Sequence, residues 1–146
     1  MKELEDANKG IQTKAAKLLG SCETVFMATN GAHGHPNVRA MMPLKVDGTH
    51  TLWFITGSDY SKVAELENDN KAAVYAYDPR KMNECRLWGS VEILSDAATI
   101  EQVWRDEFKN FFDGPEDPKI RVLRFDADNG VYVEKDKEPA EFKNEP

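Results

Sequence analysis

The spacing of apolar residues near the start of the chain matches one face of a helix. The members of this face are Ile11, Ala15, Leu18, Leu19 and Cys22. Positions three and four apart share one side of a helix, so the spacing predicts a single buried stripe. Gly20 marks its expected end, because glycine commonly terminates helices.

The pattern then changes to the two-residue period of β-strands. The three expected strands cover residues 23–30, 36–48 and 49–57. Asn30 and Gly31 form a typical hairpin-turn dipeptide between the first two strands. Pro43 cannot donate a ladder hydrogen bond, so we expect a sheet edge or a bulge at that position.

The middle of the chain predicts a short helix followed by two strands. The helix begins within residues 57–62, and Val63 and Leu66 supply its buried side. Its candidate N-terminal caps are Ser58, Asp59 and Ser61. The strands are expected at residues 71–79 and 84–94, and Gly89 predicts a bulge inside the second strand.

A third helix and two further strands are predicted in the remaining part. Asp96 is the expected cap of the helix, and Gly114 and Pro115 follow its end. Its apolar stripe consists of Ile100, Val103, Trp104, Phe108, Phe111 and Phe112, which we expect to pack in the core. The strands are expected at residues 119–127 and 130–135.

About seven closely spaced strands with three helices predict a mainly β (α+β) fold, an antiparallel barrel with the helices packed outside it. The length of 146 residues fits one domain, which we assign to residues 1–134. Eight of the 13 residues from Glu134 to Pro146 are charged. We therefore expect residues 135–146 to form a mostly disordered tail.

The chain is acidic, which narrows the classes of partner. Its 19 Lys and Arg residues against 26 Asp and Glu residues give a net charge of −7. Nucleic acids and anionic membranes attract clustered Lys and Arg, and no such cluster occurs, so neither partner is expected. The sequence contains no apolar run of about 18 residues and no signal-peptide core, so we expect a cytoplasmic protein. Large aliphatic residues are scarce, which favours burial against a second copy.

Cysteine and histidine usage gives no metal or disulfide site. Cys22 and Cys85 form neither a CxxC motif nor a zinc spacing, so we expect two free thiols. His33 and His35 share a glycine-rich turn but lack a third ligand nearby, so no metal is predicted. The P-loop, GxGxxG, HExxH and GxSxG patterns are absent.

A candidate anion site combines the second strand with the start of the second helix. Arg39 and Lys45 share one face of the expected strand, about 20 Å apart, which suits opposite ends of an elongated anionic ligand. At the helix start, backbone N–H groups, the Ser61 hydroxyl and the Lys62 ammonium form a phosphate seat that Arg39 would complete. The residues alone leave a second interpretation open, in which Arg39 is a surface strand residue and Ser61 and Lys62 only form a helix cap.

Four stretches together resemble the pyridoxamine 5'-phosphate oxidase-like, FMN-binding split-barrel superfamily, and within it the general stress protein branch. They are MATNGAHGHPNVRAMMPL, LWFITGSDYSKVAELENDNKAAVYAYD, LWGSVEIL and FFDGPEDP, and they occur in the family's order. The resemblance extends roughly from Val25 to Glu134, about three quarters of the chain.

The resemblance implies an antiparallel split barrel with FMN bound at a homodimer interface. Arg39 matches an arginine that binds the flavin phosphate, and Ser61 and Lys62 match a Ser-Lys pair at the same phosphate. The residues implied along the ring and the ribityl chain are Ala40, Met41, Met42, Phe54, Ile55 and Thr56. We further infer that Lys45 lies near the N1/C2 oxygen region of the flavin, where a positive charge stabilises the reduced form, and that Trp88 of the second subunit borders the cofactor.

One departure from the family limits the functional expectation. Full pyridoxamine phosphate oxidases end in a segment with Arg and His that grips the substrate phosphate, whereas EKDKEPAEFKNEP contains neither residue. The oxidase reaction is therefore not transferred, and no catalytic residue is assigned. Three hypotheses remain: an FMN-dependent oxidoreductase acting on a small molecule, a non-catalytic flavin-binding or storage protein, and a barrel that binds a deazaflavin or haem.

Overall fold

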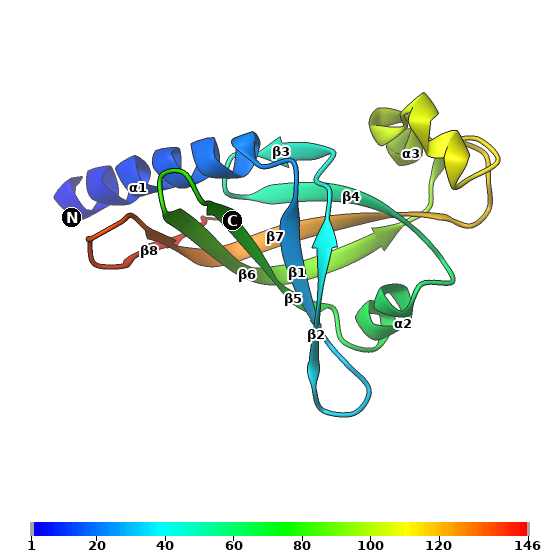
Figure 1. Cartoon of the computed structure of the whole chain (residues 1–146), viewed down its shortest axis with the longest axis horizontal. Helices are drawn as coiled ribbons and strands as arrows, with labels where there is room; N and C mark the ends of the chain where they lie inside the picture. Colours follow the sequence, from blue (N-terminus) through cyan, green and yellow to red (C-terminus); the bar gives the residue numbers. More distant parts are fainter. Residues whose placement is uncertain (1, 146) are drawn as a thin grey trace.

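A computed structural model describes residues 2–145 (Figure 1) and shows a mainly β fold. The elements are α1 (Lys2–Ser21), β1 (Val25–Asn30), β2 (Pro36–Met41), β3 (Lys45–Asp47), β4 (Thr51–Gly57), α2 (Ser61–Asn68), β5 (Lys71–Asp78), β6 (Asn83–Leu94), α3 (Ala97–Val103), the 3-10 helix η1 (Asp106–Asn110), β7 (Ile120–Val133) and β8 (Ala140–Lys143). Met1 and Pro146 lie outside the described residues.

The eight strands form one antiparallel sheet. Their order is β2-β1-β5-β6-β7-β4-β3, and β8 also pairs with β7. Within residues 2–145, β2 and β3 do not pair with each other, so the sheet is open. Helix α1 lies at one end of the sheet, and α2 and α3 lie toward the other end (Figure 1). The prediction of an antiparallel β fold with three helices is confirmed.

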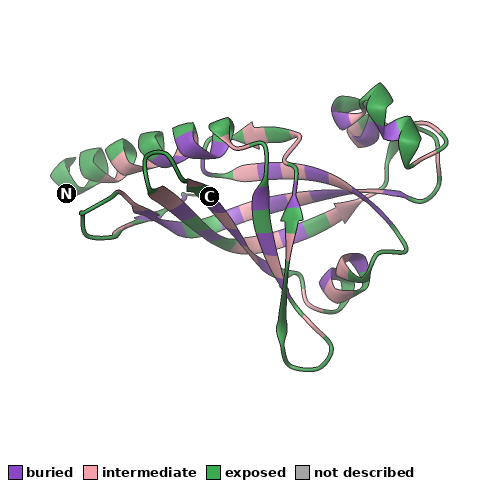
Figure 2. Cartoon of the chain, viewed as in Figure 1, coloured by how far each residue is buried: buried purple, intermediate pink, exposed green. Residues whose placement is uncertain are grey.

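The main core fills the space between the curved sheet and α1. Alternating strand residues face it, which produces the bands of buried and exposed residues in Figure 2. Helix α1 contributes Ala15, Leu18 and Leu19, the middle members of its predicted stripe. A smaller cluster of Ile100, Val103, Ile120 and Val122 lies under α3. Burying a large aliphatic or aromatic side chain contributes about 1.5–3 kcal/mol, so the two clusters hold the helices on the sheet.

Several predicted boundaries differ from the structure. Helix α1 begins at Lys2 and continues through Gly20 to Ser21. The expected strand at residues 36–48 is interrupted at Pro43, and its two parts, β2 and β3, lie at opposite edges of the sheet. The two final expected strands are one continuous strand, β7.

The third helix is shorter than its apolar period predicted. Asp96 caps α3 as expected, because its side chain accepts a hydrogen bond from the Thr99 amide. The helix stops at Val103, and the chain continues as η1. Phe108 is buried, but Phe111 is 75% exposed, so the expectation that the whole stripe packs in the core is wrong.

The bulge predicted at Gly89 is confirmed. The register between β6 and β7 shifts between Trp88 and Gly89. A Cβ atom at Gly89 would lie 2.0 Å from the backbone oxygen of Asp126, so only glycine permits this close approach.

The expectation of a disordered tail is wrong for its described part. Residues 140–143 form β8, and Phe142 is 3% exposed in the main core. Asn144 is buried, and its Nδ2 donates to the carbonyl oxygens of Thr49 (2.8 Å) and Ala127 (3.0 Å). Its Oδ1 accepts from Gln12 Nε2 and Thr49 Oγ1, both at 2.8 Å. The charges that predicted disorder lie on exposed neighbours, whereas Phe142 and Asn144 anchor the segment.

Candidate functional site

A hollow of about 260 Å³ lies where β2, β4, the start of α2 and the segment after α3 meet. We call it the α2 hollow. Its lining consists of Ala40, Met41, Met42, Leu44, Ile55, Thr56, Tyr60, Lys62, Phe108, Phe111 and Phe112. Six of the residues predicted for the flavin site line it, namely Ala40, Met41, Met42, Ile55, Thr56 and Lys62. The structure therefore brings most of the predicted set together around one space.

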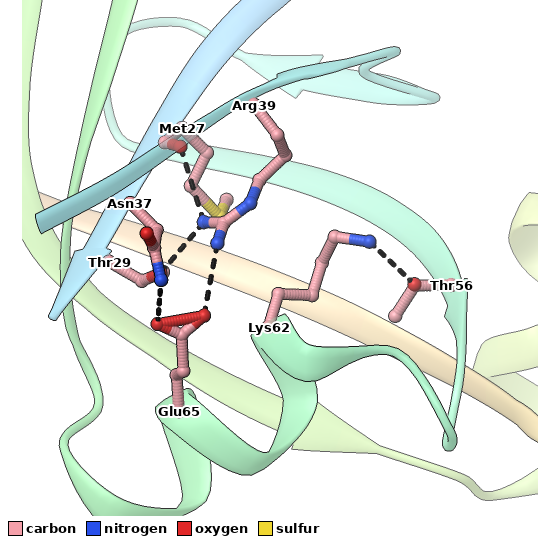
Figure 3. Close-up of polar contacts among 7 residues, drawn as sticks. All are labelled: Met27, Thr29, Asn37, Arg39, Thr56, Lys62 and Glu65. Carbon is pink, nitrogen blue, oxygen red and sulfur yellow. Dashed lines mark hydrogen bonds and ion pairs between the residues drawn. The ribbon is translucent and has the colours of Figure 1, made fainter. Parts of the chain in front are cut away.

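The ammonium group of Lys62 lies beside this hollow with neutral partners. Its Nζ donates to Thr56 Oγ1 at 3.2 Å (Figure 3) and lies 4.5 Å from the centre of the Tyr60 ring. No carboxylate among residues 2–145 forms an ion pair with it. Burial lowers the pKa of Lys62, and the nearby positive charge of Arg39 lowers it further. A partly buried cation with no counter-ion is a favourable place for an external anion.

Arg39 is held next to Lys62 by a network that fixes its guanidinium (Figure 3). Its nitrogens donate to Thr29 Oγ1 at 2.7 Å, to the Met27 carbonyl oxygen at 3.3 Å and to Glu65 Oε1 at 3.1 Å. The side chains of Arg39 and Glu65 are only 20% and 9% exposed. Glu65 therefore offsets the Arg39 charge, and Lys62 supplies the excess positive charge of the cluster.

Ser61 is the first residue of α2, next to Lys62. Tyr60 occupies the cap position, and no side-chain hydrogen bond caps this helix. The three predicted cap residues, Ser58, Asp59 and Ser61, therefore do not cap α2. The exposed Ser61 hydroxyl is not committed to capping, which is compatible with a role in a phosphate seat formed by Arg39, Ser61 and Lys62.

Phe54 and Lys45 do not line the α2 hollow. Phe54 is fully buried in the main core, on the opposite face of β4 from Ile55. Lys45 belongs to β3, and its Nζ lies 4.6 Å from the centre of the Trp53 ring. Because the strand is interrupted at residues 42–44, Arg39 and Lys45 do not share one continuous strand, and that part of the prediction is wrong.

Trp88 lies on the surface of the sheet that faces away from the core. Cross-strand pairing aligns one row of Val38, Ala28, Ala73 and Trp88, and a second row of Ala40, Phe26, Tyr75 and Arg86. We call these two rows the outer sheet face. Val38 is 65% exposed, and Phe26 and Trp88 are each 42% exposed. Ala40 belongs to this face and also lines the α2 hollow, so the two surfaces are continuous.

The aromatic wall of the hollow was not predicted from the sequence. This wall consists of Tyr60, Phe108, Phe111 and Phe112. The helical period of the three phenylalanines suggested core packing, but the helix ends before they are reached. The available signal was that Phe111 and Phe112 open the stretch FFDGPEDP, one of the four that carry the family resemblance.

A comparison with known protein families shows which family this chain belongs to. The profile of a family described as pyridoxamine 5'-phosphate oxidase-like matches residues 11–144. The chain belongs to this family. The chain is 34% identical to a Clostridium acetobutylicum protein related to general stress protein 26, with a TM-score of 0.82 and coverage of 92% of this chain and 95% of that one. The predicted family, branch and split-barrel fold class are thereby confirmed.

More distant structures share the fold. General stress protein 26 from Bacillus anthracis is 19% identical, with a TM-score of 0.78 and coverage of 92% and 98% of the two chains. A heme-binding protein from Mycobacterium smegmatis is 13% identical, with a TM-score of 0.76 and coverage of 91% and 57%. No curated protein sequence gives a match.

Two kinds of feature are absent from the part of the chain that the structure describes. No group of three or more His, Cys, Asp or Glu side chains is placed to hold a metal ion. None of the helices combines the length and the apolar character needed to cross a lipid bilayer.

Proposed function

We propose that this protein binds FMN, with the flavin phosphate at Arg39, Ser61 and Lys62 and the ring in the α2 hollow. The observation that carries the proposal is the partly buried Lys62 ammonium, which has no carboxylate partner among the described residues and lies beside Arg39. A phosphate there would accept charge-assisted hydrogen bonds, each contributing about 1.5–3 kcal/mol. The phosphate would also balance the positive charge of Lys62, because Glu65 already pairs with Arg39.

The lining of the hollow suits a planar, largely apolar ring with polar edges. Ile55, Met41 and the aromatic wall offer apolar contacts, and Thr56 offers a hydroxyl. The backbone of residues 40–42 runs along the hollow, so its N–H and C=O groups are available to the pyrimidine edge of the ring.

A homodimer through the outer sheet face would complete this site. Contiguous exposed apolar surface on a soluble chain commonly marks an interface. The face carries Val38, Phe26 and Trp88, and it meets the hollow at Ala40. A second copy on this face would place its own residues at the open side of the hollow, where Trp88 of that copy borders the cofactor.

The activity that we propose is an FMN-dependent oxidation or reduction of a small molecule. The flavin supplies the hydride chemistry when bound, so the chain has only to bind, orient and shield the reactants. The Lys62 ammonium fixes the phosphate end, and the aromatic wall excludes water from the ring. No side chain in the hollow is assigned as an acid or a base.

The first test is the absorption spectrum of the freshly purified protein, followed by release of any chromophore and by titration of the stripped protein with FMN. We expect flavin bands and a saturable complex. A haem or deazaflavin spectrum, or a protein that stays colourless after soaking in FMN, contradicts the proposal. Stopped-flow mixing with NADH and NADPH then separates turnover from storage, because flavin that stays oxidised with every donor indicates a storage protein.

The second test is the oligomeric state, measured by gel filtration with light scattering. We expect a dimer for the parent protein and a monomer with weakened FMN binding for Val38→Glu, which places a charge in the outer sheet face. A matched charge at the exposed Ala64 on α2, Ala64→Glu, leaves the dimer intact. A parent monomer that holds FMN tightly contradicts the two-subunit site.

A further inference from the structure

A second, larger cavity lies at the end of the sheet away from α2. Its volume is about 490 Å³, and its lining residues come from the second half of α1, the turn between β5 and β6, and the end of β7 with the residues that follow it. Figure 1 shows where these elements lie in the fold. We call it the lysine cavity, because Lys14, Lys17, Lys81 and Lys135 line it. None of its lining residues belongs to the α2 hollow.

The charges around this cavity are not balanced, although the whole chain is acidic with a net charge of −7. Glu134 forms ion pairs with Lys14 and with Lys137, both at 2.8 Å, so its carboxylate already has two cationic partners. The hydrogen bonds from Lys137 and Lys14 lower the pKa of Glu134 to about 2, which keeps it ionised near neutral pH. Lys17, Lys81 and Lys135 form no ion pair with any described carboxylate. Three ammonium groups from three different segments therefore face one space. The one other carboxylate of the lining belongs to Asp78, and it accepts a hydrogen bond from the Arg80 amide at 2.9 Å, so the positive charges outnumber the negative ones.

A buried polar atom at the same cavity also lacks a partner. Asn83 donates from Nδ2 to the Tyr132 hydroxyl at 2.9 Å. Its Oδ1 is buried and is the one such side-chain atom without a hydrogen-bond partner among residues 2–145. The Tyr132 hydroxyl accepts the Asn83 bond and so keeps its own proton for another acceptor. Buried polar groups in native proteins are nearly always hydrogen-bonded, so Asn83 Oδ1 indicates a donor that comes from outside the chain.

We propose that the lysine cavity binds a small phosphorylated molecule that also carries a hydroxyl or amino group. The phosphate accepts hydrogen bonds from Lys17, Lys81, Lys135 and the Tyr132 hydroxyl, and the hydroxyl or amino group donates to Asn83 Oδ1. The cavity is far larger than an inorganic phosphate ion, which leaves room for an organic body next to Leu18. Because the contacts come from α1, the β5–β6 turn and β7, the bound molecule ties α1 to the sheet.

The test is a calorimetric titration of the full chain, run both without FMN and with an excess of FMN, with glycerol 3-phosphate, inorganic phosphate and glycerol as probes. We expect saturable binding of glycerol 3-phosphate, weaker binding of inorganic phosphate and none of glycerol. Lys17→Gln, Lys81→Gln and Lys135→Gln each weaken glycerol 3-phosphate binding about three- to tenfold, since each removes one charge-assisted contact. The control Lys119→Gln, an exposed lysine outside the cavity, binds like the parent.

Two further variants make the result specific. Asn83→Leu removes the acceptor and brings the affinities for glycerol 3-phosphate and inorganic phosphate together. Arg39→Ala, which disables the flavin site, leaves glycerol 3-phosphate binding unchanged, so failure of the flavin proposal is separable from failure of this one. The proposal is overturned if glycerol 3-phosphate gives no saturable heat, if the three lysine variants bind like the parent, or if FMN or Arg39→Ala abolishes binding.

Discussion

Two polar clusters of this protein differ in how completely their groups satisfy one another. Around Asn144, the amide, hydroxyl and carbonyl groups are uncharged, and both ends of the Asn144 side chain are hydrogen-bonded. Around Arg39 and Lys62, the one carboxylate, Glu65, pairs with Arg39, whereas Lys62 has only neutral partners. In a neutral cluster whose hydrogen-bonding groups all have partners, no group is free to bind a ligand, and the hydrogen bonds contribute to stability. An unbalanced charged cluster contributes less to stability and keeps binding capacity for an anion.

The largest effect that separates the two regions is expected beside Asn144. Phe142→Ala removes a 3% exposed ring from the main core and leaves a cavity. We expect the free energy of unfolding to fall by about 3–5 kcal/mol, measured by denaturant unfolding. Lys143→Ala, on the exposed side of the same strand, changes it by less than about 0.5 kcal/mol. Equal effects of the two variants would show that β8 is not anchored by its buried residues.

The next effect tests the saturated cluster itself. Asn144→Leu leaves the buried groups of Thr49 and Gln12 without their partner. We expect a loss of about 1–3 kcal/mol in the free energy of unfolding. The dissociation constant for FMN, measured by fluorescence titration of the folded protein, stays within about twofold of the parent. A large loss of FMN affinity at unchanged stability would reverse the roles that we assign to the two clusters.

Among the variants of the second cluster, removal of Arg39, the cation that pairs with Glu65, weakens FMN binding most. Arg39→Ala weakens FMN binding at least about tenfold, because one charge-assisted contact to the phosphate is lost and the Glu65 carboxylate is left unpaired beside the phosphate. Lys62→Ala has a somewhat smaller effect, and the exposed Lys119→Ala serves as the control. Fluorescence titration gives the dissociation constants. Unchanged affinity in both Arg39→Ala and Lys62→Ala would remove the proposed phosphate seat.

The smallest effect concerns the stability of the ligand-free protein. The pKa of Lys62 is lowered from its ordinary value of 10.5, so holding this group charged costs free energy at neutral pH. That cost disappears as the pH rises through the lowered pKa toward 10.5. Lys62→Met, which keeps most of the apolar stem, is therefore as stable as the parent or more stable by up to about 0.5 kcal/mol near pH 7. The difference shrinks at alkaline pH, where FMN affinity of the parent also falls.

Thermal unfolding of the two ligand-free proteins between pH 7 and alkaline pH gives this comparison. A Lys62→Met protein that is clearly less stable than the parent at pH 7, and that gains on the parent as the pH rises, would contradict the lowered pKa and the assigned charge balance.

Local patterns in the sequence predicted the parts of the fold that depend on neighbouring residues. The turn at Asn30 and Gly31, the bulge at Gly89 and the cap at Asp96 each follow from the chemistry of one or two residues. The disorder expected for residues 135–146 was wrong because it was inferred from the high charge of the segment. Two of its residues, Phe142 and Asn144, are anchored by partners that are distant along the chain.

The candidate site was predictable where the family resemblance and local chemistry agreed. Lys62 lines the α2 hollow, and Arg39 lies close enough for its charge to lower the pKa of Lys62, although Arg39 is not part of the lining. Glu65 could not be found from the sequence, because its role arises only when α2 packs beside β1 and β2. The aromatic wall could not be predicted either, because no clear marker in the sequence shows that the helix ends before Phe108.

Strand β7 connects the two regions compared above. Its 14 residues pair with β6 on one side, and on the other side with β4 near its start and with β8 near its end. Its central amides therefore open only when neighbouring strands on both sides separate. We expect them to be the slowest in the molecule to exchange with deuterium, and both ends of the sheet to unfold as one cooperative unit.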